Sequence, residues 1–381
     1  MNQSLKEQVE QEFLNYFKTE PLLVFSPGRI NLIGEHTDYN EGFVFPAAID
    51  KGIYTAIKQS ETNKSTIVAL DKNEQYEFTT SSVSPLTTNG WQNYILGVVS
   101  EIQKKGKIVP NFNLIFSGDI PFGAGLSSSA ALENSVIFGL NQVFQLQLTK
   151  QEMIFISQQA EHNFVGVKCG IMDQYASMFG QKNKALHLDC RTLDATIHTA
   201  NFENHEFILI NTNVKHSLAD SAYNKRRAVC ENISKLLKKS SLRDIKEHDL
   251  ITIKNKISIE EYEQALYVIQ ENKRTLQAVK SLETDNVSKF GSLLFESHEG
   301  LSKQYKVSCP ELDFLVHKAQ KHPSVIGARM MGGGFGGCTI NLIKTSEKEA
   351  FLTQIQQEYA QKFKHNCTIY KVNLSNGTQI I

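Results

Sequence analysis

The chain has 381 residues, of which 41% are hydrophobic, so it is long enough for two folded domains rather than one core. Its 40 lysines and arginines balance 40 aspartates and glutamates, so no net charge favours nucleic acid or an anionic membrane as a partner. Residues 1–17 carry charges and no apolar core, and no run approaches the roughly 18 apolar residues of a membrane span, so neither signal peptide nor span is predicted. The six cysteines form no CxxC pair, which gives no indication of zinc, disulfides or export, and we expect a cytoplasmic protein.

Short apolar runs bounded by turn residues alternate irregularly with helical patterns along the chain. Strands are predicted at residues 22–25, 114–116, 207–210 and 339–343. Apolar spacing predicts a helix over 130–144, and the pair Thr149 and Glu152 is a capping-box signature for another. This mixture, without regular βαβ alternation, predicts an α+β fold. A polar stretch at 201–205 predicts a boundary between domains at 1–204 and 205–381.

The first polar segment, residues 26–40, reads SPGRINLIGEHTDYN and follows the first predicted strand. Arg29 and Asn31 lie on one side of an alternating stretch that is otherwise isoleucine and leucine. The density of donors and acceptors suits a sugar, whose vicinal hydroxyls each donate and accept. Residues 38–42 could instead form a solvated turn.

The second segment, residues 121–131, reads PFGAGLSSSAA and leads from the second predicted strand into a helix that begins near Ser127. Small residues let the backbone approach a ligand, and the free amides of a helix start attract a di- or triphosphate. Ser129 could also place its hydroxyl on magnesium. An N-capped helix is the alternative, but three serines and two alanines in one turn exceed what capping requires. No lysine follows as in a Walker A loop, and Ser128 occupies the place of the third glycine of a Rossmann loop.

The third segment, residues 327–338, reads GARMMGGGFGGC and precedes the last of these strands. Five glycines in six residues indicate backbone that passes close to a ligand or to another loop. A flexible hairpin is an equally good interpretation of this segment alone.

Together and in this order, the three segments resemble the three motifs of the GHMP kinase superfamily, which is named for galactokinase, homoserine kinase, mevalonate kinase and phosphomevalonate kinase. Residues 28–42, GRINLIGEHTDYNEG, are similar to the signature that separates galactokinases from the other members. Residues 169–174, CGIMDQ, and residues 211–227 match as well. The resemblance covers most of the chain and is weakest over 235–324.

The resemblance implies a two-domain α+β fold. The N-terminal domain would be like the second domain of ribosomal protein S5, the C-terminal domain would be ferredoxin-like, and substrate would bind in the cleft between them. It also implies transfer of phosphate from ATP, with Mg²⁺, to the anomeric hydroxyl of galactose. We expect a monomer whose partners are these small molecules, without nucleic acid or membrane.

The resemblance also implies residue roles, each at a position that matches a motif. Asp173 matches the catalytic base and Arg29 the transition-state stabiliser, and an arginine beside that carboxylate would keep it ionised. The positions that match sugar contacts are Glu35, His36, Thr37, Asp38 and Tyr223. The positions that match the phosphate loop are Gly123, Ala124, Gly125, Leu126, Ser127, Ser128 and Ser129. Ser129 and Glu161 match magnesium ligands, which suits the preference of that ion for oxygen.

Each role has a structural alternative. Glu161 could lie on a solvated helix face, Asp173 could cap a helix, Tyr223 could be core packing and Arg29 could form a structural ion pair. Two other functions also fit the motifs, namely an N-acetylgalactosamine kinase and a regulator that binds galactose and ATP without catalysis. Regulators of that kind are altered in the serine-alanine stretch of the phosphate loop, whereas residues 127–131 are complete here, which favours an enzyme.

Overall fold

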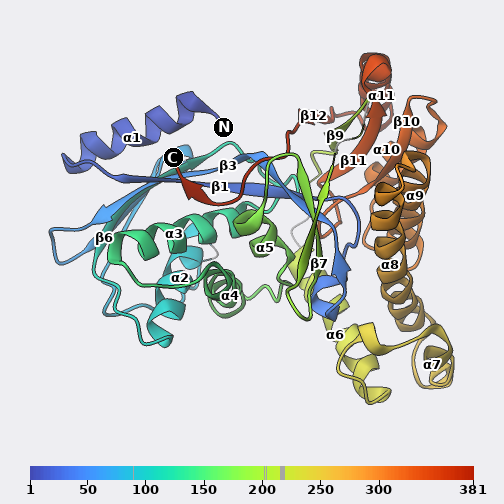
Figure 1. The fold of residues 1–381 in the computed structure, drawn as a ribbon, viewed down its shortest axis with the longest axis horizontal. Coiled ribbons are helices and arrows are strands. Elements are labelled where there is room, and N and C mark those ends of the chain that lie inside the picture. Colours follow the sequence, from blue (N-terminus) through green and yellow to red (C-terminus); the bar gives the residue numbers. More distant parts are fainter. Residues whose placement is uncertain (89, 201, 203, 215–218) are drawn as a thin grey trace.

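A computed structural model describes residues 1–88, 90–200, 202, 204–214 and 219–381. The chain forms two main β-sheets, which lie one after the other along the long axis of the molecule (Figure 1). Helices cover both sheets, and a pair of long helices, α8 and α9, stands at the far end of the second one.

The first sheet has six strands in the order β13-β1-β3-β6-β4-β5. Their bounds are β1 Leu22–Asn31, β3 Pro46–Gln59, β4 Ser65–Ala69, β5 Glu74–Phe78, β6 Phe112–Gly118 and β13 Gln379–Ile380. Only β4 and β6 pair in parallel within this sheet as described. The C-terminal strand β13 therefore pairs with β1, the first strand of the chain, and forms one edge of this sheet.

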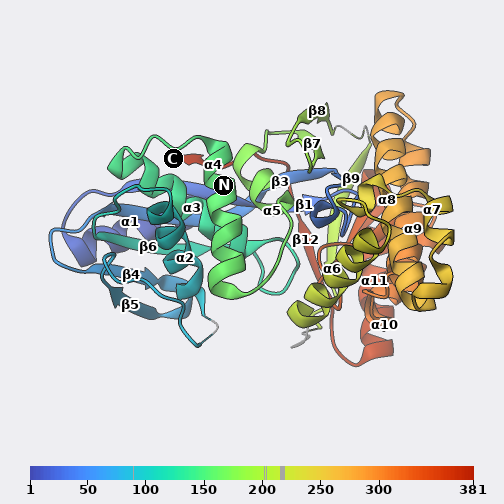
Figure 2. The same cartoon turned by 90° about the horizontal axis from the view of Figure 1, so that it is seen from below.

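The two faces of this sheet are covered by different helices because successive side chains of a strand point to opposite sides. On one face, Leu23 and Phe25 pack with Val9 and Phe13 of α1 (Gln3–Phe17). On the other, Val24 joins the core under α2 to α5, so the sheet is enclosed on both sides (Figure 2). The bounds are α2 Trp91–Lys104, α3 Ser128–Phe144, α4 Lys150–Ala160 and α5 Met172–Phe179.

The second sheet has four antiparallel strands in the order β10-β11-β9-β12. Their bounds are β9 His205–Asn211, β10 Val325–Met330, β11 Cys338–Lys344 and β12 Thr368–Lys371. With α10 (Pro310–Lys321) before β10 and α11 (Lys348–Phe363) before β12, the chain order is β-α-β-β-α-β. This is the connectivity of a ferredoxin-like domain, as expected.

Among the described residues between β9 and α10 there are four further helices, and a small sheet, β2-β7-β8, adjoins the first sheet. Their bounds are α6 Ala219–Leu236, α7 Glu247–Ile251, α8 Ile259–Glu283, α9 Val287–Lys303, β2 Phe43–Val44, β7 Lys184–Asp189 and β8 Ala195–Thr199. Short 3₁₀ turns occur at Asp38–Asn40, Leu70–Lys72, Leu242–Asp244, Lys254–Lys256 and Thr345–Glu347, and a π turn occurs at Glu161–Val165. One apolar cluster joins the halves, since Ile30 of β1 and Leu32, just after that strand, belong to the same cluster as Leu209 and Ile340 of the second sheet.

The predicted α+β class, strands and helices are confirmed. The four strand predictions fall inside β1, β6, β9 and β11, and the helix over 130–144 is α3. Thr149 and Glu152 form the capping box that begins α4. The predicted domain division stays a prediction, because residues 201 and 203 lie outside the described residues and β13 crosses back to the first sheet. Among the helices described, none is long and apolar enough to cross a membrane.

Candidate active site

Arg29, near the end of β1, forms a two-pronged ion pair with Asp173 in the first turn of α5. Arg29 Nε donates to Asp173 Oδ1 at 2.8 Å, and Nη2 donates to Oδ2 at 2.9 Å. The remaining nitrogen, Nη1, donates to the carbonyl of Gly125 at 2.6 Å, in the loop before α3. The Arg29 side chain is 5% exposed, whereas that of Asp173 is 25% exposed. One guanidinium therefore joins the first and second motifs and leaves its carboxylate partner open to a ligand.

Negative charge gathers around this guanidinium. Burial alone lowers the pKa of Arg29, but Asp173, Glu35 and Asp38 raise it, and the net shift is upward. The structure thus brings the predicted base, the predicted stabiliser and two predicted sugar-binding carboxylates into one place.

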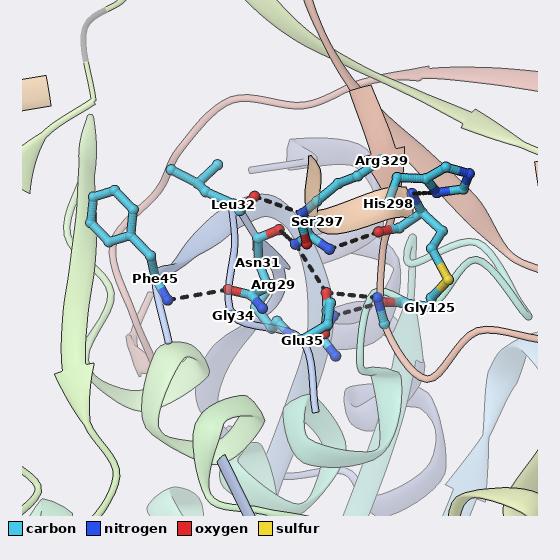
Figure 3. Close-up of polar contacts among 12 residues, drawn as sticks. Arg29, Asn31, Leu32, Gly34, Glu35, Phe45, Gly125, Ser297, His298 and Arg329 are labelled. Carbon is cyan, nitrogen blue, oxygen red and sulfur yellow. Dashed lines mark hydrogen bonds and ion pairs between the residues drawn. The ribbon is translucent and has the colours of Figure 1, made fainter. Parts of the chain in front are cut away.

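Glu35 is buried and connects the first motif to the third. Glu35 Oε1 accepts from Arg329 Nη2 at 3.1 Å and from the Gly332 amide at 2.9 Å (Figure 3). Arg329 is itself fully buried and donates to the carbonyls of Leu32 and Met330, each at 2.7 Å, and of Asn31. The glycine-rich segment is therefore fixed against the first motif rather than a flexible hairpin.

The glycine-rich segment also packs on the phosphate loop. A side chain at Gly332 would lie 3.1 Å from the Gly125 carbonyl, and one at Gly337 would lie 3.4 Å from the Gly123 carbonyl. Of the two functional interpretations of these glycines, close approach to another loop is the one that the structure displays.

His36 and Thr37 occupy the turn after Glu35. His36 has a left-handed backbone (φ 62°), and its Nδ1 hydrogen-bonds to the Tyr39 hydroxyl at 2.9 Å. Burial, together with the nearby Arg226, lowers the pKa of His36 to about 3, so the ring is neutral at physiological pH. Thr37 Oγ1 donates to the carbonyls of Gly34 and Phe43 at 2.8 and 2.7 Å, so its proton serves the loop itself.

Asp38 and Tyr223 complete this part of the site. Burial raises the pKa of Asp38 to about 7, with a further contribution from Asp173. Gly170 lies directly against the Asp38 carboxylate, where any side chain would collide with it. The Tyr223 ring centre is 5.4 Å from that of His36, and burial and Asp38 raise the pKa of its hydroxyl.

The phosphate-loop serines do not cap α3. Ser127 precedes the helix in a left-handed conformation (φ 59°), and its side chain makes no cap hydrogen bond. Its Oγ is buried and has no hydrogen-bond partner within the described chain. The capping alternative for this segment is therefore wrong for Ser127, and a ligand atom could satisfy both this hydroxyl and the free amides of the helix start.

A cavity of about 540 Å³ opens beside this helix start. Ser128 and Ser129 line one side of it. Its aromatic lining comes from α2, β6 and the phosphate loop, with Trp91, Tyr94, Phe116 and Phe122. An apolar cleft that ends at a helix N-terminus can hold a flat ring and a chain of phosphates at once.

Glu161 is buried at the π turn that follows α4, not on a solvated face. Glu161 Oε2 accepts from Gln174 Nε2 at 3.2 Å, and Cys169 Sγ lies at 3.7 Å from it. Hydroxyl and carboxylate oxygens are ligands that magnesium prefers, so Ser129 and Glu161 fit that ion chemically. Among the described residues, no group of three or more His, Cys, Asp or Glu is placed to hold a metal, so phosphate oxygens would have to supply further ligands.

Sequence reasoning did not single out two buried residues that interact with the predicted site residues Glu35 and Glu161. Arg329 lies inside the third motif, and its signal was a lone arginine in an otherwise apolar and glycine-rich stretch. Glu133 follows Ser129 by one turn of α3 and is fully buried, and burial and Glu161 raise its pKa. The sequence feature that could have indicated Glu133 is its position four residues after Ser129, which places both side chains on the same face of α3.

Comparisons with known proteins agree with this geometry. The model for the GHMP kinases N terminal domain matches residues 93–181, the galactokinase galactose-binding signature matches 11–59, and the GHMP kinases C terminal model matches 278–361. The galactokinase of Thermosipho africanus is 41% identical over 93% of this chain and 98% of its own length, and that of Clostridium beijerinckii is 40% identical over 98% of each.

Solved structures give the same result. The crystal structure of Lactococcus lactis galactokinase complexed with galactose superposes with a TM-score of 0.94 at 34% identity, covering 98% of this chain and 99% of that one. The mevalonate kinase of Methanococcus jannaschii, with a TM-score of 0.65, 19% identity and coverage of 94% and 100%, shares the fold. With relatives this similar over almost their whole length, the chain belongs to the galactokinase family of the GHMP kinases.

Proposed function

We propose that the protein transfers the γ-phosphoryl group of ATP to the anomeric hydroxyl of α-D-galactose, giving galactose 1-phosphate and ADP. The observation that carries this proposal is the Arg29–Asp173 pair, which lies between the Gly125 carbonyl of the phosphate loop and the Glu35–Asp38 turn. Phosphoryl transfer depends mainly on positioning and on charge neutralisation, and this arrangement provides both beside a proton acceptor. The galactokinase relatives support galactose as the acceptor.

In the proposed reaction, Asp173 accepts the proton of the anomeric hydroxyl as that oxygen attacks the γ-phosphorus. The bond from the γ-phosphorus to the bridging oxygen breaks, and ADP leaves with that oxygen. Arg29, fixed by Asp173 and by the Gly125 carbonyl, faces the negative charge that spreads over the transferring group.

For the nucleotide, we assign the phosphates to the α3 N-terminus and the base to the aromatic cavity beside it. The buried Ser127 hydroxyl and the residues from Gly123 to Ser129 supply donors to phosphate oxygens. Ser129 and Glu161 would hold Mg²⁺, which neutralises phosphate charge when bound.

For the sugar, we assign hydroxyl contacts to Glu35, His36, Asp38 and Tyr223, which surround the pair. Thr37 differs from them, because its proton is directed to the Gly34 and Phe43 carbonyls, and its proposed role is to hold the turn. The cytoplasmic location and the monomeric state stay predictions.

An assay of ADP release tests the function. Galactose should support turnover, whereas glucose, N-acetylgalactosamine, arabinose, mevalonate and homoserine should support little, and ³¹P NMR should show phosphate on the anomeric carbon. Absence of ADP release with galactose would rule out the enzyme in favour of the non-catalytic regulator. Faster turnover with N-acetylgalactosamine than with galactose would show that N-acetylgalactosamine is the substrate.

The magnesium assignment makes a prediction about Glu161. Glu161→Gln removes the charge of a proposed ligand, so a higher magnesium concentration should be needed for the half-maximal rate, while galactose binding without nucleotide should be unchanged. Titration of the rate with magnesium, beside calorimetry with galactose, measures both. The control is Glu231→Gln, which changes a half-exposed glutamate of α6 paired with Arg227. If the two variants have the same magnesium dependence, Glu161 is not a ligand.

The raised pKa of Asp38 makes a prediction about pH. The ionised carboxylate can accept from two sugar hydroxyls, and with a pKa near 7 it becomes fully ionised only above neutral pH. Galactose should therefore bind more tightly, in the absence of nucleotide, as the pH rises from about 6 to 8. His36 does not titrate in this window, since its pKa is about 3. Calorimetry should show this dependence in the wild type and its loss in Asp38→Asn; a flat wild-type profile contradicts the prediction.

A further inference from the structure

Helix α8 lies outside all three motifs, yet its side chains hold the backbone of the sugar-binding turn at three points. Tyr267 Oη donates to the Glu35 carbonyl at 3.1 Å. Glu271 Oε1 accepts from the Gly34 amide at 3.0 Å. Asn272 Oδ1 accepts from the Phe43 amide at 2.9 Å. These contacts hold residues 34–43 at both ends, and two of the helix residues that make them, Tyr267 and Glu271, lie on one face because they are four residues apart.

Glu271 is the centre of this contact. Its carboxylate is fully buried, with Oε1 also accepting from Ser297 of α9 at 2.7 Å and Oε2 accepting from Arg274 Nε at 2.6 Å. A buried carboxylate is costly unless each oxygen is paired, so a charge in this position needs all three of its partners. The Gly34 amide is one of them, which ties the conformation of the turn to the state of the helix.

The helix also restricts which residues the turn can contain. Gly34 has a left-handed backbone (φ 95°), and a side chain there would lie 2.6 Å from the Phe43 carbonyl and 3.0 Å from Thr275 Oγ1 of α8. A side chain at Gly42 would collide with the Asn272 amide oxygen. Both glycines belong to the segment that resembles the galactokinase signature, and at Gly42 the nearest obstacle to a side chain comes from α8.

We propose that Glu271 is a positioning residue for sugar binding: through the Gly34 amide, and with Tyr267 and Asn272, it sets the backbone from which Glu35, His36 and Asp38 project. Glu271 does not touch the substrate. This inference rests on the proposed contacts of these three residues with galactose.

The test replaces the contacts of α8 one at a time. Glu271→Gln keeps the shape of the side chain, but its amide nitrogen must face either Arg274 or the Gly34 amide, so one contact is lost. Loss of a charge-assisted hydrogen bond should weaken galactose binding by about tenfold, and Asn272→Leu should weaken it several-fold. The KM for ATP should be unchanged in both variants. Calorimetry with galactose alone, steady-state kinetics and thermal melting provide the three measurements.

Two controls make the result specific. Val316→Ala removes buried atoms from α10, in an apolar cluster that contains no residue of the turn, and should lower the melting temperature without changing galactose affinity. Asp38→Ala tests the proposed sugar contacts directly. If Asp38→Ala weakens galactose binding and Glu271→Gln does not, the inference fails and the proposed site stands; if neither does, the proposed site itself is wrong.

A general loosening of the structure gives a different pattern. Equal losses for galactose and ATP in Glu271→Gln would overturn the positioning role. If Glu271→Gln does not fold, Asn272→Leu and Tyr267→Phe decide the question, since each removes a single hydrogen bond to the turn. Unchanged galactose affinity in both would overturn the proposal.

Discussion

Asp173→Asn is expected to reduce turnover by ~10²–10⁴-fold, the usual cost of losing one general base, while galactose binding survives. The amide has nearly the shape of the carboxylate but cannot accept a proton from the anomeric hydroxyl at neutral pH. It also presents an NH₂ group to one of the two Arg29 nitrogens, so one prong of the ion pair is lost. Turnover from ADP release and affinity from galactose calorimetry separate chemistry from binding.

Asp244→Asn is the matched control for this change. Asp244 also accepts two hydrogen bonds from one arginine, with Arg191 Nη1 and Nη2 at 2.9 Å each, but both side chains of this pair are about a third exposed. Its substitution should leave turnover close to that of the wild type. A loss of less than about tenfold in Asp173→Asn would assign Asp173 to orienting the hydroxyl rather than to removing its proton.

Asp38→Ala is expected to weaken galactose binding and to narrow the preference for galactose over glucose. The two sugars differ in the orientation of one hydroxyl, so a group that reads that hydroxyl must discriminate between them. A buried polar partner left unpaired by the wrong sugar can give discrimination of ~10⁴-fold. Asp38 is buried against Gly170 beside Asp173, and its carboxylate can accept from two neighbouring hydroxyls.

The measurement is kcat/KM for both sugars with both proteins. Glu41→Ala is the comparison variant, because Glu41 lies three residues further along the same turn and its carboxylate pairs with Arg191 on the surface. It should keep the wild-type preference. If Asp38→Ala keeps the full preference for galactose over glucose, another residue recognises the hydroxyl that distinguishes the two sugars.

The sequence was sufficient for the features that have a local pattern. Strands, α3 and the α4 capping box follow from apolar spacing and turn residues, and all were confirmed. The site motifs were found because each is a short run of unusual residues. Their mutual contacts were not predictable locally, since Arg29 is 96 positions from Gly125 and 144 positions from Asp173 in the sequence.

Some residues of the site could not be recognised from the sequence, because their amino-acid types are common in the helices that contain them. Glu271 is one of several glutamates in a long amphipathic helix, where a carboxylate usually faces water. Nothing within α8 distinguishes it, because its partners are a backbone amide of the first motif and a serine of α9. Glu133 is similar, since an acidic residue in a helix acquires meaning only when the surroundings bury it.

The Arg329 contacts have a consequence for how the protein acquires its activity. Arg329 and Glu35 are separated by 294 residues, so this contact forms only after a very long loop has closed. Long-range contacts of this kind slow folding, because chain entropy is lost before the contact repays it. Helices and strand pairs that are close in sequence, such as β4 with β5, can therefore form well before the turn that carries Glu35 is fixed. On refolding from denaturant, the far-ultraviolet circular dichroism signal should recover before catalytic activity does. Recovery of turnover would then indicate that the long-range contacts of the site have formed, and not only the secondary structure.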